Sequence, residues 1–426
     1  MASARTSYAR CIAMASAMLT AALLLLASAA PAAPGSEKVL IGFRGRPDTG
    51  ALRALGARIL HAYDLVPAVA AEVPSGRLSA IRALKGVLYV EPDYPIYATG
   101  PQGARLALAL PAAGDAKPLS VAVVETLPWG IERIGAPEVW LGTPELPGNR
   151  GTGVAVAILD TGIDYTHPDL ADNYVSGYDF VNDDYDPLDD NGHGTHVAGT
   201  IAARDDGPNS GGGNTTGISV VGVGPEISLY VAKILNREGS GSTSDAVAAL
   251  NVAARYGMQV VNMSFGSPFS STTMKSACGR ASAAGIVLVA AAGNEAAPWL
   301  DAPARYPSVI SVGATNSLDQ HVAFSNTSKN LELCAPGVAV LSTMPTYTVR
   351  LNQYPYGYQT YYDYLDGTSM AAPHVSGAAA LVIAAHPDWS NSQVRSRLRS
   401  TATDLGASGR DSYFGYGLVN AAAAAQ

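Results

Sequence analysis

Val154-Ala-Val-Ala-Ile-Leu-Asp160 is a continuous apolar run that ends in a carboxylate. A second run, Ile286–Ala291, leads through Ala292 and Gly293 to the amide of Asn294. Runs without a polar face are typical of strands buried on both sides, as in parallel sheets covered by helices. Ligands of such sheets bind beyond the carboxyl ends of the strands. The two polar residues are therefore expected at a functional edge.

The same alternation of strands and helices continues outward from these two runs. Helices follow strands in the pattern of an α/β fold with a parallel central sheet in three layers. Strands are predicted at Val154–Leu159, Leu229–Leu235, Val260–Met263 and Ile286–Ala291, and helices at His193–Ala203, Ser244–Tyr256 and Thr273–Ala284.

Four polar residues are candidates for chemistry: Asp160, His193, Asn294 and Ser369. Each alone is more often a turn or helix-cap residue. His193 and His196 lack the His-Glu-x-x-His spacing of a zinc site. Taken together, the four indicate nucleophilic catalysis, because a serine hydroxyl needs a histidine to take its proton and that histidine needs an orienting carboxylate.

The segments around these residues resemble the motifs of the subtilisin-like serine proteases, or subtilases. The resemblance covers about residues 128–420 and implies a subtilisin-like fold and endopeptidase activity. The implied roles are Ser369 as nucleophile, His193 as general base and acid, Asp160 as orienting carboxylate, and Asn294 with the Ser369 N–H as oxyanion hole.

The N-terminus has the features of an export signal. Two arginines precede the apolar run Ile12–Leu26, and Ala27-Ser-Ala29 offers a small-residue cleavage site, which predicts a signal peptide over residues 1–29 and a secreted or periplasmic protein. A membrane anchor is less favoured because the run is shorter than a bilayer-spanning helix, and no later segment is expected to be long enough to span. Export permits a disulfide, so Cys278 and Cys334 could form a bridge or remain thiols.

A smaller folding unit is predicted over residues 36–97. Its expected order is β-α-β-β-α-β, with strands at Lys38–Phe43, Arg58–Leu65, Val69–Val73 and Val87–Val90 and helices at 47–56 and 75–84. This α+β, ferredoxin-like unit resembles the subtilase pro-domain, which implies a folding chaperone and inhibitor that is removed by cleavage. Residues 98–127 read as a linker, with the mature start expected between Ala98 and Thr126, and 128–426 as the catalytic domain.

Charge separates the two units and excludes one class of partner. The chain of 426 residues has a net charge of −8, but residues 30–97 hold 8 Lys/Arg against 6 Asp/Glu, whereas residues 98–426 hold 17 against 29. An acidic body argues against binding nucleic acid. The weak charge complementarity between the two units favours docking of the N-terminal unit on the body. We expect the protein to be a monomer.

Substrate contacts follow from the resemblance. It implies that an extended substrate pairs near Ser264, Phe265 and Gly266, and that Ala291, Ala292 and Gly293 line the pocket for the residue before the scissile bond. Small side chains there predict a broad enzyme that favours bulky apolar residues, whereas Glu295 at the rim could also attract Lys or Arg. Cleavage after paired basic residues is the alternative.

Acidic loops indicate calcium. Residues 179–190 contain six carboxylates, and oxygen-rich loops suit Ca²⁺. The segment resembles a calcium loop of thermitase-like subtilases, which implies Asp179 and Asp184 as ligands, and a second family site would use Asp169. A solvated loop without metal is an equally open interpretation.

Two other function classes remain open from the sequence. The fold could be catalytically idle and serve as a binding module. Alternatively, an acyl-enzyme could be attacked by an amine, so that the protein joins peptides. The mass of the products distinguishes peptide hydrolysis from peptide joining, because hydrolysis adds a water and transpeptidation does not.

Overall fold

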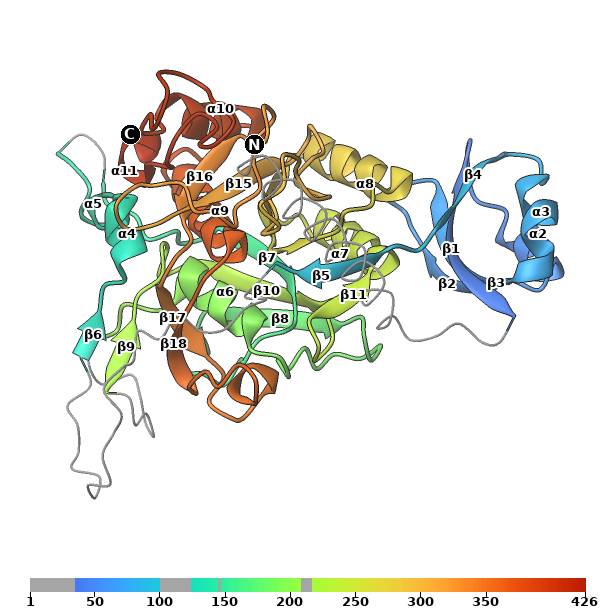
Figure 1. The fold of residues 1–426 in the computed structure, drawn as a ribbon, viewed down its shortest axis with the longest axis horizontal. Helices are drawn as coiled ribbons and strands as arrows, with labels where there is room; N and C mark the ends of the chain where they lie inside the picture. Colours follow the sequence, from blue (N-terminus) through green and yellow to red (C-terminus); the bar gives the residue numbers. More distant parts are fainter. Residues whose placement is uncertain (1–34, 100–123, 145–146, 208–216) are drawn as a thin grey trace, which may run out of the picture.

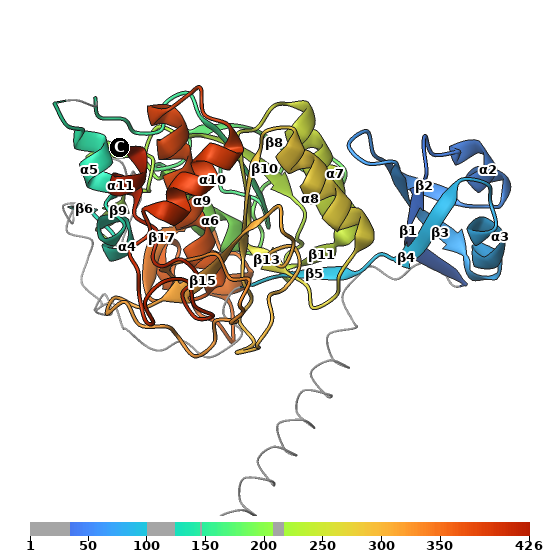
Figure 2. The same ribbon diagram turned by 90° about the horizontal axis from the view of Figure 1, so that it is seen from above.

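The computed structural model describes residues 35–99, 124–144, 147–207 and 217–426 (Figure 1). The predicted signal peptide and most of the predicted linker lie outside the described residues. A small unit formed by residues 36–92 stands beside a larger body that contains a seven-stranded sheet (Figures 1 and 2).

The small unit has the predicted β-α-β-β-α-β order. Its antiparallel sheet has the order β2-β3-β1-β4. One face packs on its own helices through residues such as Ile41 and Val69, whereas Leu40 and Ala70 on the other face join a core cluster of the larger body. The elements are β1 (Ser36–Phe43), α2 (Thr49–Ala54), β2 (Arg58–Ala62), β3 (Ala68–Pro74), the 3₁₀ turn η1 (Ser75–Arg77), α3 (Leu78–Arg82) and β4 (Val87–Pro92).

The larger sheet is parallel throughout, as predicted, and has the order β16-β15-β14-β12-β7-β10-β8. Four of its strands are those expected from the apolar runs, and β8, β15 and β16 were not expected. The bounds are β7 (Ala155–Asp160), β8 (Tyr174–Asp179), β10 (Ser228–Lys233), β12 (Val260–Met263), β14 (Val287–Ala291), β15 (Ile310–Thr315) and β16 (Leu333–Pro336).

Helices cover both faces of this sheet. Successive strand residues point to opposite faces, so Val156 and Ile158 pack with α6 (His193–Ala202) and α9 (Thr368–Ala385), whereas Ala157 and Leu159 pack with α7 (Thr243–Arg255) and α8 (Thr272–Ala283). The body therefore has the three layers that the sequence predicts.

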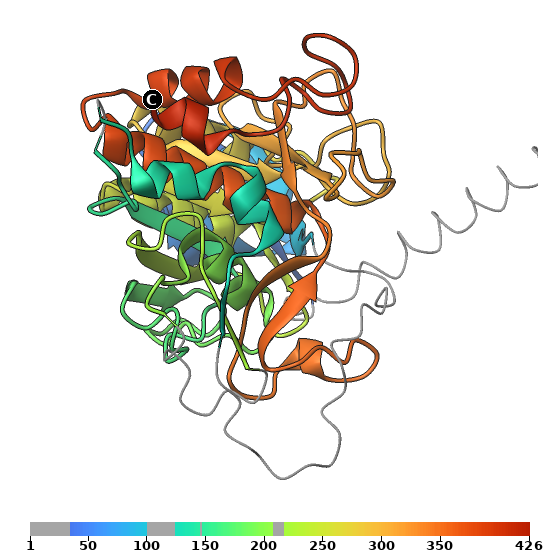
Figure 3. The ribbon, with the colours of Figure 1, turned by 90° about the vertical axis from the view of Figure 1, so that its left-hand side faces the viewer.

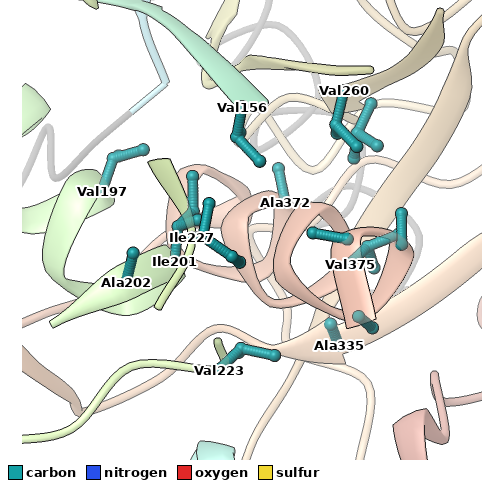
Figure 4. Packing of buried hydrophobic residues seen from close by; sticks show 14 of the residues in the cluster. Val156, Val197, Ile201, Ala202, Val223, Ile227, Val260, Ala335, Ala372 and Val375 are labelled. Carbon is teal, nitrogen blue, oxygen red and sulfur yellow. The ribbon is translucent and has the colours of Figure 1, made fainter. Parts of the chain in front are cut away.

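Helix α9 is the central element of one helical layer. By length and apolar composition it is a candidate membrane span, so the expectation that no later segment qualifies was wrong, but 89% of it is buried inside the protein. Figure 4 shows Ala372 and Val375 of α9 among Val156, Ile201 and Val260. The apolar character of α9 is therefore that of a core helix.

The remaining elements surround this core. Helix α10 (Asn391–Ser400) begins with a capping box, in which Ser390 and Gln393 exchange hydrogen bonds. The hairpin β17–β18 stands at the edge of the body (Figure 3). The others are β6 (Val124–Thr126), α4 (Trp129–Arg133), α5 (Ala136–Leu141), β9 (Ile218–Val220), β17 (Val340–Met344), η2 (Arg350–Asn352), β18 (Tyr361–Leu365) and α11 (Ala421–Ala425).

The two cysteines of the body are free and buried. Of the two open interpretations, the thiols are therefore the one that the structure supports. Burial raises the pKa of the Cys278 thiol to about 12 and also raises that of Cys334. Neither thiol is thus a ready nucleophile.

Candidate active site

The segment that follows the small unit lies in the body as an added strand. Strand β5 (Pro95–Ala98) runs antiparallel between β11 (Ser240–Ser242) and β13 (Phe265–Gly266). The Ala98 N–H donates to the Gly239 carbonyl over 2.8 Å. Pairing of this kind is the way an extended peptide binds to a sheet edge, with backbone hydrogen bonds on both sides.

The next residue, Thr99, forms hydrogen bonds with three of the predicted residues through its backbone N–H and carbonyl groups. Its N–H donates to the Ser264 carbonyl over 3.2 Å. Its carbonyl oxygen accepts from Asn294 Nδ2 at 2.6 Å and from Ser369 Oγ at 2.5 Å. The peptide carbonyl of Thr99 is thus held by a side-chain amide and next to a serine hydroxyl.

The orientation of the Asn294 amide is fixed from behind. Its Oδ1 accepts from both the backbone N–H and the hydroxyl of Thr368, each over 2.9 Å. Because Oδ1 is used there, Nδ2 faces the Thr99 carbonyl. Such a preorganised donor is what stabilises a developing oxyanion.

Asp160 and His193 form the second pair of the site. Asp160 ends β7 and His193 begins α6, and the strand end therefore meets the helix start. His193 Nδ1 and Asp160 Oδ1 are 2.7 Å apart, and both side chains are almost completely buried. Asp189 holds the start of α6 by accepting from the N–H groups of Gly192 and Thr195.

The electrostatics of the pair favour a basic imidazole. Burial lowers the pKa of His193, but the charge and hydrogen bond of Asp160 outweigh it, so the pKa is raised above 6.5. Its Nε2 has no hydrogen-bond partner among the described residues. The nitrogen that would accept a proton is therefore unengaged, while the Ser369 hydroxyl is turned toward Thr99 and Ser264.

Ser369 is the second residue of α9, so the start of this helix lies beside the Thr99 carbonyl. Pro373 has no N–H to donate to the Ser369 carbonyl one turn earlier. The Ser264 hydroxyl replaces that donor over 2.9 Å. This contact ties the nucleophile candidate to the segment that pairs with β5.

Two carboxylates, one in the last strand of the small unit and one just after it, bind helix N-termini of the body. Glu91 accepts from the N–H groups of Thr272 and Thr273 at the start of α8. Asp93 accepts from the N–H and hydroxyl of Ser244 at the start of α7. Helix N-termini attract negative charge, so these contacts hold the unit on the body through carboxylates rather than through its net positive charge.

The remaining predicted substrate residues lie in the same region. Ser264, Phe265 and Gly266 contact the β5 segment, as described above. Ala291 and Ala292 are fully buried at the end of β14. Gly293 follows them beside the carboxylates of Glu295 and Asp301.

The predicted metal ligands are engaged in protein hydrogen bonds. Asp179 Oδ1 accepts from the N–H groups of Val181 and Asn182, and Asp184 Oδ1 from that of Asp186. Asp169 Oδ2 accepts from the Tyr362 hydroxyl. Within the described ranges, no group of three or more His, Cys, Asp or Glu side chains is arranged to hold a metal ion.

The fold, the strand β5 paired beside the site, and the polar residues of the site together define a class of protein. Residues 151–417 match the subtilase family, Peptidase_S8. The chain therefore belongs to the subtilase family and is a serine-type endopeptidase acting on peptide substrates.

Particular relatives cover most of the chain. Subtilisin DY from Bacillus licheniformis is 46% identical over 306 residues, which are 71% of this chain and 100% of the relative. Subtilisin E from Bacillus subtilis strain 168 is 36% identical over 94% of this chain and 93% of its own. A similar solved structure is fervidolysin from Fervidobacterium pennivorans, described as a keratinolytic enzyme related to subtilisin. It has a TM-score of 0.75 and 31% identity, and the alignment covers 92% of this chain and 61% of fervidolysin.

Sequence reasoning missed two parts of the site. Strand β11, with Gly239 before it, is a short Ser-Gly-Ser segment whose composition is that of a turn. Asp301 lies in the irregular segment after β14, where an aspartate is an ordinary loop residue. Its position beside Gly266 and Gly293 depends on contacts between distant segments, and no local signal marks it.

Proposed function

We propose that this subtilase is exported as a zymogen that cleaves its own Thr99–Gly100 bond and then hydrolyses other proteins. The observation that carries the proposal is the Thr99 carbonyl, which accepts from Asn294 Nδ2 and Ser369 Oγ while its own strand is paired on both sides. Gly100 falls within the predicted range for the mature start.

The chemistry follows from the positions of the four polar side chains. Ser369 Oγ attacks the Thr99 carbonyl carbon while His193 Nε2 takes the hydroxyl proton. Asp160 holds the imidazole through Nδ1 and stabilises its charged form. Asn294 Nδ2 stabilises the oxyanion, and His193 returns the proton to the leaving nitrogen of Gly100. Water then releases the acyl group from Ser369.

The same contacts explain why the small unit would inhibit the mature enzyme. After cleavage, β5 keeps its backbone partners in β11 and β13, and Glu91 and Asp93 keep their helix N-termini. Inhibition therefore needs no contact beyond those that position the bond for cutting. The unit serves as a partner of its own body, as the resemblance to a pro-domain implies, and the mature enzyme acts as a monomer.

Export and substrate range rest on the sequence. The predicted signal peptide supports a secreted or periplasmic enzyme without a stable membrane anchor. The acidic body supports protein rather than nucleic-acid substrates. Ala291, Ala292 and Gly293 leave room for a bulky apolar side chain before the scissile bond, which supports a broad endopeptidase.

Calcium remains a prediction as a structural ion with no part in the chemistry. Its support is the acidic sequence of residues 179–190, and Asp169, Asp179 and Asp184 are the residues that the resemblance implies. Excess chelator is expected to lower the thermal unfolding midpoint, and added Ca²⁺ to restore it. An unchanged unfolding midpoint would contradict both predicted calcium sites.

The proposal is tested by expressing the chain without residues 1–29 as wild type and as Ser369→Ala. Intact mass and casein hydrolysis are followed for both. The wild type is expected to lose its N-terminal region, to acquire Gly100 as its first residue and to digest casein with a gain of one water per cut. Ser369→Ala is expected to stay full-length and inactive.

A matched control is Ser400→Ala, which removes a hydroxyl at the exposed end of α10 and should process normally. If Ser369→Ala processes and digests casein as the wild type does, Ser369 is not the nucleophile. Products that lack the added water would instead support peptide joining.

A further inference from the structure

A buried carboxylate lies next to the side chain that precedes the proposed scissile bond. A Cβ built on Gly266 would meet Asp301 Oδ2 at 2.8 Å and Thr99 Cγ2 at 2.9 Å. Asp301 Oδ2 and the Thr99 side chain are thus neighbours, because both lie next to the position that a Cβ of residue 266 would occupy. Gly266 leaves the space between them open because it has no side chain.

Glu295 brings a second carboxylate to this place. A Cβ on Gly293 would meet Glu295 Oε2 at 2.7 Å and Asp301 Oδ2 at 3.0 Å. Glu295 Oε2 is held by Asn326 Nδ2 over 2.7 Å. The two acidic groups therefore converge at Gly293, and one of them is fixed by a buried amide.

Neither carboxylate of this pair is neutralised by a direct ion pair. Among the described residues, neither Asp301 nor Glu295 forms an ion pair with Lys or Arg. Arg305, whose charge lowers the pKa of Asp301, donates its Nε–H to the Leu300 carbonyl over 2.8 Å. Burial, and then the charge of Glu295, raise the pKa of Asp301 to about 7. Two carboxylates this close hold a proton between them unless a positive charge arrives.

We propose that Asp301 and Glu295 select a cationic side chain, lysine or arginine, for the residue before the scissile bond. The inference rests on the proposed function, because it takes Thr99 as the residue in that position. It refines the bulky side chain expected from Ala291, Ala292 and Gly293 by giving its far end a charge.

The length of the side chain fits this assignment. Thr99 ends at Cγ2, next to the space beside Gly266, whereas a lysine continues from its Cγ through two more carbons to Nζ. The aliphatic part of lysine would lie along the small residues at the end of β14, and Nζ would reach Asp301 Oδ2. Long side chains of this kind bury their carbons while the charge finds its partner.

Thr99 itself does not need that charge. Its peptide bond is presented by the same chain and held by β11 and β13, so cleavage is intramolecular and pairing supplies the positioning. A substrate from solution lacks this advantage and depends more on its side chains.

The experiment compares two peptides on the processed wild-type enzyme: Ile-Tyr-Ala-Lys-p-nitroanilide and the same peptide with norleucine in place of lysine. Norleucine keeps the aliphatic chain and removes the charge. We expect kcat/KM to be higher for lysine by about tenfold or more, the scale of a partly buried charge pair. In Asp301→Asn the preference should fall to about threefold or less, and in Glu295→Gln to an intermediate value.

Asp388→Asn is the charge-matched control, because it removes a carboxylate beyond the far end of α9 and should keep the lysine preference. Equal rates for lysine and norleucine in the wild type would overturn the inference while leaving the proposed function intact. A preference that survives in Asp301→Asn, Glu295→Gln combined would also overturn it. Failure to cleave either peptide, together with casein, would instead count against the proposed function.

Discussion

Two side chains of the same segment enter pockets of opposite character. Ile96 is buried in an apolar pocket lined by Phe265, Met274 and Tyr306, and it belongs to the core cluster of the α7–α8 layer. Thr99, three residues further on, lies beside the carboxylate of Asp301. In the first pocket an apolar side chain packs against apolar residues. In the second, the carboxylate of Asp301 lies beside Thr99, which carries no positive charge.

The difference separates two tasks in substrate recognition. Apolar contact is roughly proportional to buried area and tolerates many side chains of suitable size, so the Ile96 pocket contributes affinity. A buried carboxylate penalises side chains that leave it without a partner, so the Asp301 pocket contributes selectivity. A mutation or substrate change in one pocket should therefore leave discrimination at the other unchanged.

The largest expected effect comes from placing a charge in the apolar pocket. Replacing isoleucine by aspartate in Ile-Tyr-Ala-Lys-p-nitroanilide should lower kcat/KM by about a hundredfold or more, because an unpaired buried carboxylate costs several kcal/mol. Alanine at the same place should cost about ten- to fiftyfold, from the lost apolar contact alone. Rates on the processed enzyme measure both.

The matching change in the precursor is Ile96→Asp, which should slow release of the N-terminal region as followed by intact mass. Ile96→Val is its control and should process at nearly the wild-type rate. If aspartate and alanine peptides were cleaved equally well, the pocket seen around Ile96 would not be in contact with substrate.

A smaller effect is expected from closing the charged pocket. In Gly266→Ala the new Cβ would come within 2.9 Å of Thr99 Cγ2 and 2.8 Å of Asp301 Oδ2. Overpacking of this degree costs about 1–3 kcal/mol, so kcat/KM for the lysine peptide should fall about ten- to hundredfold. A peptide with glycine before the scissile bond has no side chain to clash and should lose much less.

The ratio between isoleucine and alanine peptides should not change in Gly266→Ala, because Gly266 is not among the residues that line the Ile96 pocket. An equal loss for lysine and glycine peptides would mean that β13 itself is displaced, and the separation of the two pockets would fail.

The two pockets also differ in what the sequence could reveal. Phe265 comes two residues after the predicted strand Val260–Met263, and its place beside a substrate strand could be expected from the resemblance to subtilases. Asp160, His193, Asn294 and Ser369 could be proposed because each sits in a distinctive local motif at the edge of a predicted strand or helix.

Asp301 could not be found in this way. Its meaning depends on Gly266 and Gly293, which come from two other segments, and only the folded chain brings the three together. The strands β8, β15 and β16 were missed for a related reason. Their local sequences, such as Tyr174–Asp179 with its glycine and polar residues, become strands through pairing with neighbours rather than through their own pattern.

The smallest expected effect is the pH dependence of the charged pocket. Burial raises the pKa of Asp301, the charge of Glu295 raises it further and that of Arg305 lowers it, with a net value of about 7. Below that value Asp301 is protonated and neutral, and above it the carboxylate is charged. The ratio of kcat/KM for lysine over norleucine should therefore rise with pH toward about 7 and then stay level, while lysine itself remains charged to about pH 10.

Taking the ratio isolates this pocket from the catalytic groups. His193 must be neutral to accept the Ser369 proton, and its raised pKa places its own titration above pH 6.5, but it acts equally on both peptides and cancels. The Ile/Ala ratio of the apolar pocket, measured over the same pH range, should stay flat because no titrating side chain lines it except the Tyr306 phenol, whose raised pKa keeps it neutral there. A lysine ratio that is equally flat in the wild type would mean that Asp301 does not sense the substrate charge, and the contrast between the two pockets would reduce to size alone.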